Sequence, residues 1–110
     1  MMMKTTIRSH HVVCFDVDDT LINYEYDVDK SEYLIEVSVS DHDSNKHLYT
    51  QLVEPIKANI DALIQHKKKG HFIIVWTQAG HDWAEAVVEA LGLDDFVDMC
   101  MDKPKWYYDD

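Results

Sequence analysis

Two short, strongly apolar segments constrain the fold more than any other feature of this sequence. Residues 12–15 read Val-Val-Cys-Phe, residues 72–76 read Phe-Ile-Ile-Val-Trp, and polar residues follow each run. Short runs rich in β-branched and aromatic side chains are typical of strands buried on both faces, as in a parallel sheet. A helical pattern lies between the two runs, and parallel neighbours need such a crossover. We therefore predict an α/β fold built on an open parallel sheet.

Two helices and further strands complete the predicted alternation. Apolar residues recur at helical spacing from Ile56 to Ile64, where Pro55 suits the first helical turn and Gly70 the end. A second helix is predicted from about residue 81 to residue 91, before Gly92. Further β-prone segments cover residues 96–101 and 106–108. The whole chain, residues 1–110, is predicted to form one domain.

One segment, residues 33–53, interrupts this alternation. Tyr33, Ile35, Val37 and Val39 share one face of an extended segment, and the turn-forming residues 43–45 follow. This pattern predicts a β-hairpin inserted between the first strand and the first helix. The hairpin is either a lid over a functional site or an extra edge of the sheet.

The composition restricts the classes of partner. The chain has 10 Lys and Arg against 21 Asp and Glu, for a net charge of −11. Such an acidic balance disfavours nucleic acids and anionic membranes as partners. No apolar run approaches the ~18 residues that suggest a membrane span. The apolar content of 46% indicates a folded chain, and cytoplasm is the expected location.

The cysteines and histidines carry no recognisable metal-ligand spacing. Cys14 and Cys100 lie in apolar stretches, which predicts free, buried thiols in a reducing compartment. The seven histidines show no zinc pattern, and surface roles are expected for them. His42 and His81 are the candidates for substrate contact.

An acidic cluster directly follows the first apolar run. Asp16, Asp18 and Asp19 are crowded at the end of a buried strand, where like charges repel unless a cation or hydrogen bonds compensate. Asp16 and Asp18, two residues apart, can turn toward one point, and their oxygens suit Mg²⁺. The alternative is an ordinary acidic turn with a helix cap.

Several segments resemble the haloacid dehalogenase (HAD) superfamily. The sequence VVCFDVDDTL is similar to its first motif, FIIVWT to its second, and WYYDD to the acidic pair of its fourth. Lys103-Pro104 resembles the Lys-Pro that precedes this pair in small members. The segments VWTQAGHDWAEAVVEALGL and DKPKWYYDD are also similar to uncharacterised HAD-like proteins of tailed phages. The resemblance implies a Rossmann-like, three-layer fold in which residues 33–53 form a minimal cap.

The resemblance also implies a Mg²⁺-dependent phosphomonoester hydrolase that acts through an aspartyl-phosphate. Asp16 would be the nucleophile, and Asp18 would be the general acid and base. Thr77 would form a hydrogen bond with an oxygen of the phosphoryl group as it is transferred. Lys103 or Lys105 would offset the phosphate charge, while Thr20 and Gln78 would contact the substrate. The implied metal ligands are Asp16, Asp18, Asp109 and Asp110.

The spacing between Lys103 and Asp109 leaves three arrangements open. Lys103 and Asp109 are only six residues apart, at most about 20 Å of extended chain. Either the last strand is very short, or Lys103 enters from the side, or Lys105 takes the lysine role.

The alternative function is a catalytically impaired HAD-like binding protein, such as a phage protein that acts on a host component. A small phosphorylated substrate and a homodimer that covers the open site are expected for the enzyme.

Overall fold

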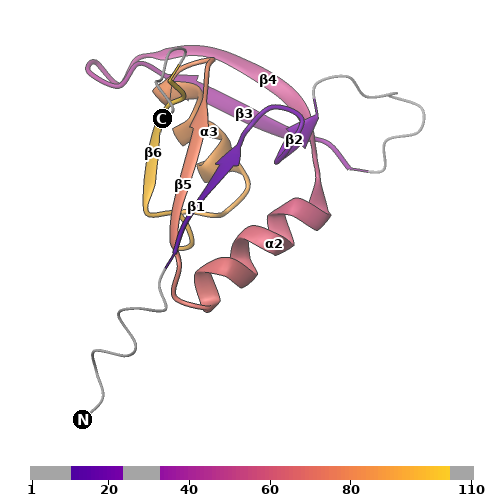
Figure 1. The fold of residues 1–110 in the computed structure, drawn as a ribbon. Helices are drawn as coiled ribbons and strands as arrows, with labels where there is room; N and C mark the ends of the chain where they lie inside the picture. The colour runs from indigo at the N-terminus through magenta and orange to yellow at the C-terminus, as the bar shows by residue number, and fades with distance from the viewer. Residues whose placement is uncertain (1–10, 24–32, 105–110) are drawn as a thin grey trace.

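A computed structural model describes residues 11–23 and 33–104, and it has a mixed α/β fold (Figure 1). Three strands form a parallel sheet in the order β1-β5-β6. Three others form an antiparallel sheet in the order β2-β4-β3. The strands are β1 (Val12–Asp16), β2 (Ile22–Asn23), β3 (Ile35–Ser40), β4 (His47–Pro55), β5 (Phe72–Thr77) and β6 (Met99–Asp102), and the helices are α2 (Lys57–Lys68) and α3 (His81–Ala90). The predicted parallel pairing of the two apolar runs is confirmed.

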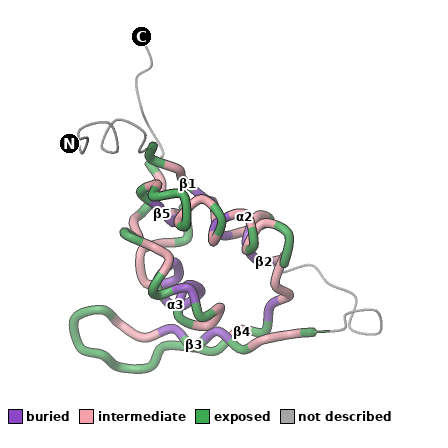
Figure 2. Tube along the Cα trace, turned by 90° about the horizontal axis from the view of Figure 1, so that it is seen from below, coloured by how far each residue is buried: buried purple, intermediate pink, exposed green. Residues whose placement is uncertain are grey.

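Helix α3 lies between the two sheets, and α2 packs against β5. Helix α3 contacts β5 and β6 on one side and β3 on the other, and Figure 2 shows the hairpin on the far side of α3 from β1 and β5. The core joins all these layers, from Phe15 and Val75 of the parallel sheet through Leu63 and Val87 of the helices to Val53 of β4. No helix among the described residues is long and apolar enough to span a membrane.

Both predicted helices are present, with one correction at the start of α2. Pro55 is the last residue of β4, and Ile56, rather than a residue before Pro55, is the N-cap of α2. Pairing with Ile22 keeps Pro55 in the sheet. The proline has no backbone N–H to donate, so it fits a strand end as well as a helix start. At the other end Gly70 has φ 88°, a left-handed conformation that terminates the helix as predicted.

The predicted hairpin is confirmed as β3 and β4. Its strands pair from Ile35 and Val53 to Ser40 and His47, with an irregularity after Val39. In the turn, the Asp41 carboxylate accepts hydrogen bonds from the backbone N–H and the hydroxyl of Ser44. Strand β2 was not predicted, because two residues carry no periodic pattern.

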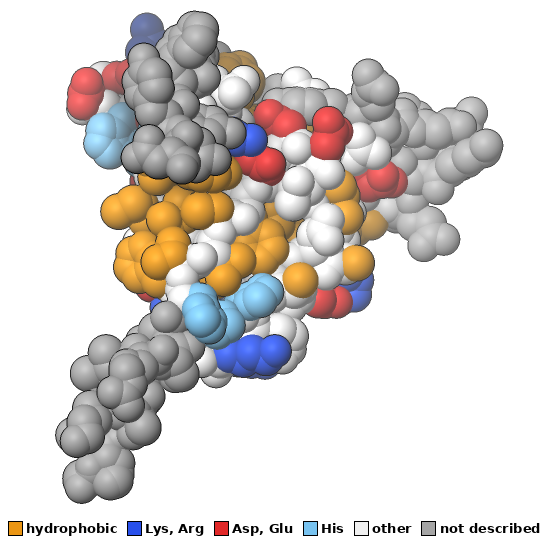
Figure 3. All heavy atoms as spheres, in the orientation of Figure 1, with side chains coloured by type: hydrophobic (Ala, Val, Ile, Leu, Met, Phe, Trp, Pro, Cys, Tyr) orange, Lys and Arg blue, Asp and Glu red, His pale blue; other side chains and the backbone are white. Residues whose placement is uncertain are grey.

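One face of the parallel sheet is not covered by any described element. Both helices pack on the face that carries Phe15 and Val75, so the expected helix layer on the opposite face is absent from residues 11–23 and 33–104. Figure 3 shows hydrophobic side chains gathered over β1, β5 and β6 on that opposite face. Val12, Phe72 and Met99 there are 64%, 42% and 46% exposed. The prediction that these strands are buried on both faces is therefore wrong for the described residues.

The two cysteines lie on opposite faces of the parallel sheet. Both thiols are free, as predicted, but Cys14 lies on the uncovered face and is exposed. Cys100 is partly buried against the core. Its burial, together with the nearby carboxylates of Glu85 and Asp94, raises its pKa to about 11.

Asp98 links the end of α2 to the start of β5. Its carboxylate accepts a hydrogen bond from the Ile73 backbone N–H and pairs with the Lys67 ammonium, both at 2.7 Å. Partial burial pushes the pKa of Asp98 up, but these two partners outweigh it and hold the pKa below its ordinary value. The lysine at the C-terminal end of α2 thus has a structural role beyond the helix dipole.

We expect Asp98 to make the protein sensitive to acid. A carboxyl group whose pKa is lower in the folded state stabilises the fold above its unfolded pKa, and this stabilisation is lost as the pH falls through the folded pKa. Urea unfolding of wild type and Asp98→Asn should therefore show the wild type more stable at pH 6 and the difference shrinking below about pH 4. A difference that stays constant from pH 6 to pH 3 would exclude this role.

Candidate active-site cleft

A cleft of about 210 Å³ lies at the carboxyl ends of the parallel strands. Its walls contain four of the residues proposed for catalysis and one proposed for substrate contact. The lining residues are Asp16, Val17, Asp18, Thr77, Gln78 and Lys103. Ligands of open α/β sheets bind at this end of the strands, so the position suits a functional site.

The register of the sheet brings these residues together. Asp16 is paired with Trp76 across β1 and β5, and Thr77 with Asp102 across β5 and β6. The backbone N–H of Lys103 donates to the Thr77 carbonyl at 2.9 Å, which extends this pairing one residue past β6. The cleft therefore follows from the parallel alignment of three strand ends.

Lys103 and Asp16 form the main charge pair of the cleft. The Lys103 Nζ lies 3.1 Å from Asp16 Oδ1, and the two side chains are 35% and 43% exposed. An ion pair this accessible contributes little to stability, typically about 0–1 kcal/mol. Both groups remain open to a ligand in the cleft. Of the two candidate lysines, Lys103 reaches the cleft, and Lys105 lies outside the described residues.

Asp18 is oriented by two hydrogen bonds. The indole Nε1 of Trp83 donates to Oδ1 at 3.0 Å, and the Thr77 hydroxyl donates to Oδ2 at 3.4 Å. Thr77 is 4% exposed and its hydroxyl oxygen also accepts the Ala79 N–H. These contacts fix the Asp18 carboxylate in the mouth of the cleft.

Trp83 contacts the cleft through Asp18, which the sequence did not reveal. Its side chain belongs to the core and is 2% exposed. A buried indole N–H needs an acceptor, and here the acceptor is Asp18. The two residues are 65 positions apart, and no local pattern connects them. Of the other tryptophans, Trp76 is partly exposed on the uncovered face and Trp106 lies outside the described residues.

A tight turn follows β1 and positions Asp16 and Asp18 in the cleft. Val17 is fully buried, and its carbonyl accepts the backbone N–H groups of Leu21 and Ile22. Asp19 adopts a left-handed conformation with φ 66°, which Asp tolerates better than most residues. Thr20 lies in this turn, where its carbonyl accepts the amide of Asn59 at 2.8 Å, but it does not line the cleft.

The hairpin does not contribute to the described cleft. No residue of β3 or β4 lines it, so a lid role has no contact to support it among residues 33–55. Instead Tyr49 of β4 stacks on Trp83, with ring centroids 6.3 Å apart. Asp109 and Asp110 lie outside the described residues.

A second group of possible metal ligands lies outside the cleft. His42, His81, Asp82 and Glu85 have donor atoms within 4.8 Å of one another. The expectation that histidines show no metal-ligand arrangement is therefore incomplete. Sequence spacing gave no signal because His42 belongs to the hairpin turn, far along the chain from the other three.

Comparisons with known proteins add no relative. No protein-family model, no curated protein and no solved structure matches this chain. The HAD resemblance of the motifs therefore stays a prediction.

Proposed function

We propose that this chain is a Mg²⁺-dependent phosphomonoester hydrolase of the HAD type that acts through an aspartyl-phosphate. The observation that carries the proposal is the convergence of Asp16, Asp18, Thr77 and Lys103 on one cleft. A nucleophile, an acid–base group, a hydroxyl donor and a cation are the parts that phosphoryl transfer by this route needs. They come from the ends of three different strands, so chain proximity alone does not explain their meeting.

Asp16 has the accessibility that a nucleophile requires. Its side chain is 43% exposed and lines the cleft, and within residues 11–23 and 33–104 its charge partner is Lys103. The free oxygen would attack phosphorus, the bond from phosphorus to the ester oxygen would break, and the phosphoryl group would be held on Asp16. The Lys103 ammonium would offset charge on the phosphoryl oxygens.

Asp18 would act as the general acid and then as the general base. In the first step it would donate a proton to the leaving alcohol, and in the second it would accept one from the water that attacks the aspartyl-phosphate. The N–H of Trp83 and the hydroxyl of Thr77 keep its carboxylate in a single orientation. Orientation of this kind lowers the entropic part of the barrier.

The donor set of the cleft fits Mg²⁺. Mg²⁺ binds hard oxygen ligands, retains several waters and commonly uses one or two carboxylates with substrate phosphate. Asp16 supplies an accessible carboxylate, whereas both oxygens of Asp18 already accept hydrogen bonds. Asp16, the Asp18 backbone and the pair Asp109 and Asp110 would hold the ion, which supplies positive charge to the phosphate when bound.

Metal dependence tests the proposal. Phosphate release from an aryl phosphate and a panel of phosphorylated metabolites should be measured with Mg²⁺, with EDTA, and after either Mg²⁺ or Zn²⁺ is added back. We expect release with Mg²⁺, loss with EDTA, and recovery with Mg²⁺ but not with Zn²⁺. The choice of ion separates this cleft from the histidine-containing cluster, which suits softer metals.

The alternative function predicts a different outcome. A HAD-like protein that binds without catalysis would release no phosphate from any substrate under any metal condition. Release that is insensitive to EDTA would also reject the proposed mechanism. The homodimer expected from the sequence stays a prediction, and sedimentation of the full chain would test it.

A further inference from the structure

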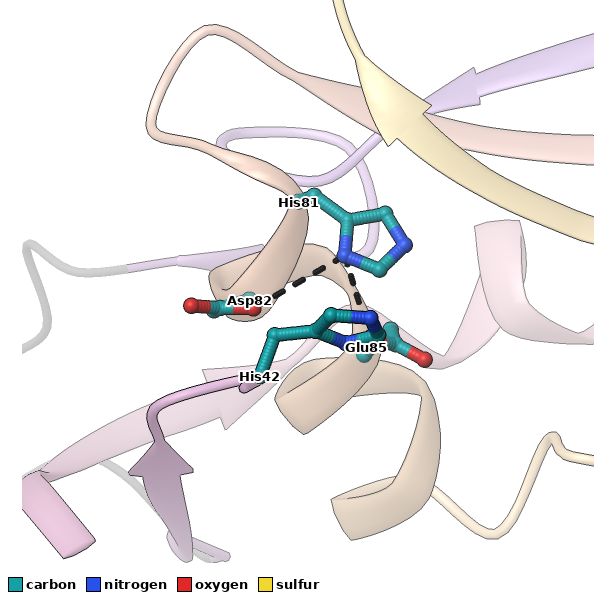
Figure 4. Close-up of side chains that lie close together, drawn as sticks. All are labelled: His42, His81, Asp82 and Glu85. Atoms are coloured by element: carbon teal, nitrogen blue, oxygen red, sulfur yellow. Dashed lines mark ion pairs between the residues drawn. The ribbon is translucent and has the colours of Figure 1, made fainter. Parts of the chain in front are cut away.

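Four side chains from two separate elements converge beside the first turn of α3 (Figure 4). His81, Asp82 and Glu85 belong to α3, where His81 and Glu85 are four residues apart and share a face. His42 comes from the turn between β3 and β4. Its ring meets that of His81 edge to face, with centroids 5.2 Å apart.

Both imidazoles approach the same carboxylate oxygen. Glu85 Oε1 lies 3.2 Å from His81 Nδ1 and 3.5 Å from His42 Nδ1. Asp82 Oδ1 lies 3.7 Å from the same nitrogen of His81. The donor atoms of a tetrahedral zinc site, each about 2.0–2.1 Å from the ion, are roughly 3.4 Å from one another. These three separations are close to those around a bound ion, and one donor atom from each of the four residues lies within 4.8 Å of the others.

We propose that four residues form a binding site for Zn²⁺ that cross-links the hairpin to α3. They are His42, His81, Asp82 and Glu85. Imidazole nitrogens and carboxylate oxygens both bind zinc, while Mg²⁺ and Ca²⁺ take oxygen ligands. The site is distinct from the cleft of Asp16, and it does not depend on the hydrolase function.

The surroundings favour a cation. Three of the four residues, His42, Asp82 and Glu85, line an open cleft of about 340 Å³, and no Lys or Arg occurs among its described lining residues. Asp41 and Glu89 line the same cleft and add negative charge. The N-terminus of α3 carries about half a positive charge, and the carboxylates of Asp82 and Glu85 more than offset it.

Helix stabilisation alone does not explain the cluster. Acidic residues in the first turn favour the helix dipole, which accounts for Asp82. It does not account for His42, which reaches Glu85 from another element. The bound ion would cross-link the two elements, as structural zinc sites do.

The same helix turn also carries Trp83. Tyr49 of the hairpin stacks on Trp83, whose indole N–H holds Asp18. An ion bound by His42 and α3 would therefore fix the hairpin against the residue that orients Asp18.

Metal titration of the full chain tests the site directly. Metal-stripped protein should be titrated with Zn²⁺ by calorimetry and with Co²⁺ by visible absorption. We expect one equivalent to bind, with the intense d–d bands of tetrahedral Co²⁺. Glu85→Gln and His42→Ala should each weaken binding at least about tenfold, because loss of even an outer-shell partner commonly costs that much. These side chains are 49% and 64% exposed, so circular dichroism should show an unchanged fold.

Two histidine variants serve as controls. His47 lies on the same hairpin but contacts Thr50, so His47→Ala should bind Zn²⁺ as wild type does. His71 belongs to a different pair, with its Nδ1 3.0 Å from that of His66, and His71→Ala should also bind normally. The absence of binding, or binding lost in His71→Ala and retained in Glu85→Gln, would overturn the proposal.

Discussion

Replacement of Asp16 by asparagine is expected to reduce phosphate release at least about a thousandfold, because loss of a covalent nucleophile removes the main route of catalysis. The amide keeps the size of the side chain but is a far weaker nucleophile than the carboxylate. Because the Asp16 side chain is 43% exposed, we expect the fold to be retained in this variant. Steady-state rates with saturating Mg²⁺ and an aryl phosphate would measure the loss.

Asp19→Asn is the matched control for this experiment. It makes the same chemical change three residues away, at an exposed side chain that does not line the cleft. Asn tolerates the left-handed backbone of this position, so the turn should be retained. Equal losses in the two variants would mean that Asp16 has no special role and would contradict the mechanism.

Leu63→Ala is expected to destabilise the fold by about 2–5 kcal/mol, the range for large-to-small changes in well-packed cores. Leu63 is fully buried, and the other residues of α2 are at least partly exposed. It joins the helix to the core that supports β1 and β5. Urea unfolding monitored by circular dichroism would give the change in free energy.

Leu52→Ala provides the comparison for that measurement. Leu52 lies in β4 and is 43% exposed, so the same truncation leaves no cavity there. We expect a change within roughly 0.5 kcal/mol, as for most surface substitutions. A loss in Leu63→Ala no greater than in Leu52→Ala would contradict the packing described for α2.

The sequence was informative wherever a local pattern carried the signal. The runs that became β1 and β5, the two helices and the hairpin all follow from periodicity and from stop residues such as Gly70 and Gly92. Strand β6 also lies where a β-prone segment was expected. The convergence of Asp16 with Thr77 follows once those two strands are paired side by side.

Other features depend on contacts between distant residues and could not be predicted. The apolar sequence of residues 72–76 is compatible with a strand covered on one face and with a strand covered on both. The exposure of Phe72 could therefore not be predicted from the sequence. The hydrogen bond from Trp83 to Asp18 joins two separate elements. His42 and Glu85 also come from separate elements. Single-sequence patterns describe neighbours along the chain and not these pairs.

The proposed mechanism requires a phosphoryl group bound covalently to Asp16, which mass spectrometry can detect. Protein mixed with Mg²⁺ and aryl phosphate should be quenched in acid, digested and searched for a phosphorylated peptide. We predict one phosphoryl group on Asp16, present in wild type and Asp19→Asn and absent in Asp16→Asn. Turnover without a phosphoryl group on Asp16, or a phosphoryl group on another residue, would contradict the mechanism.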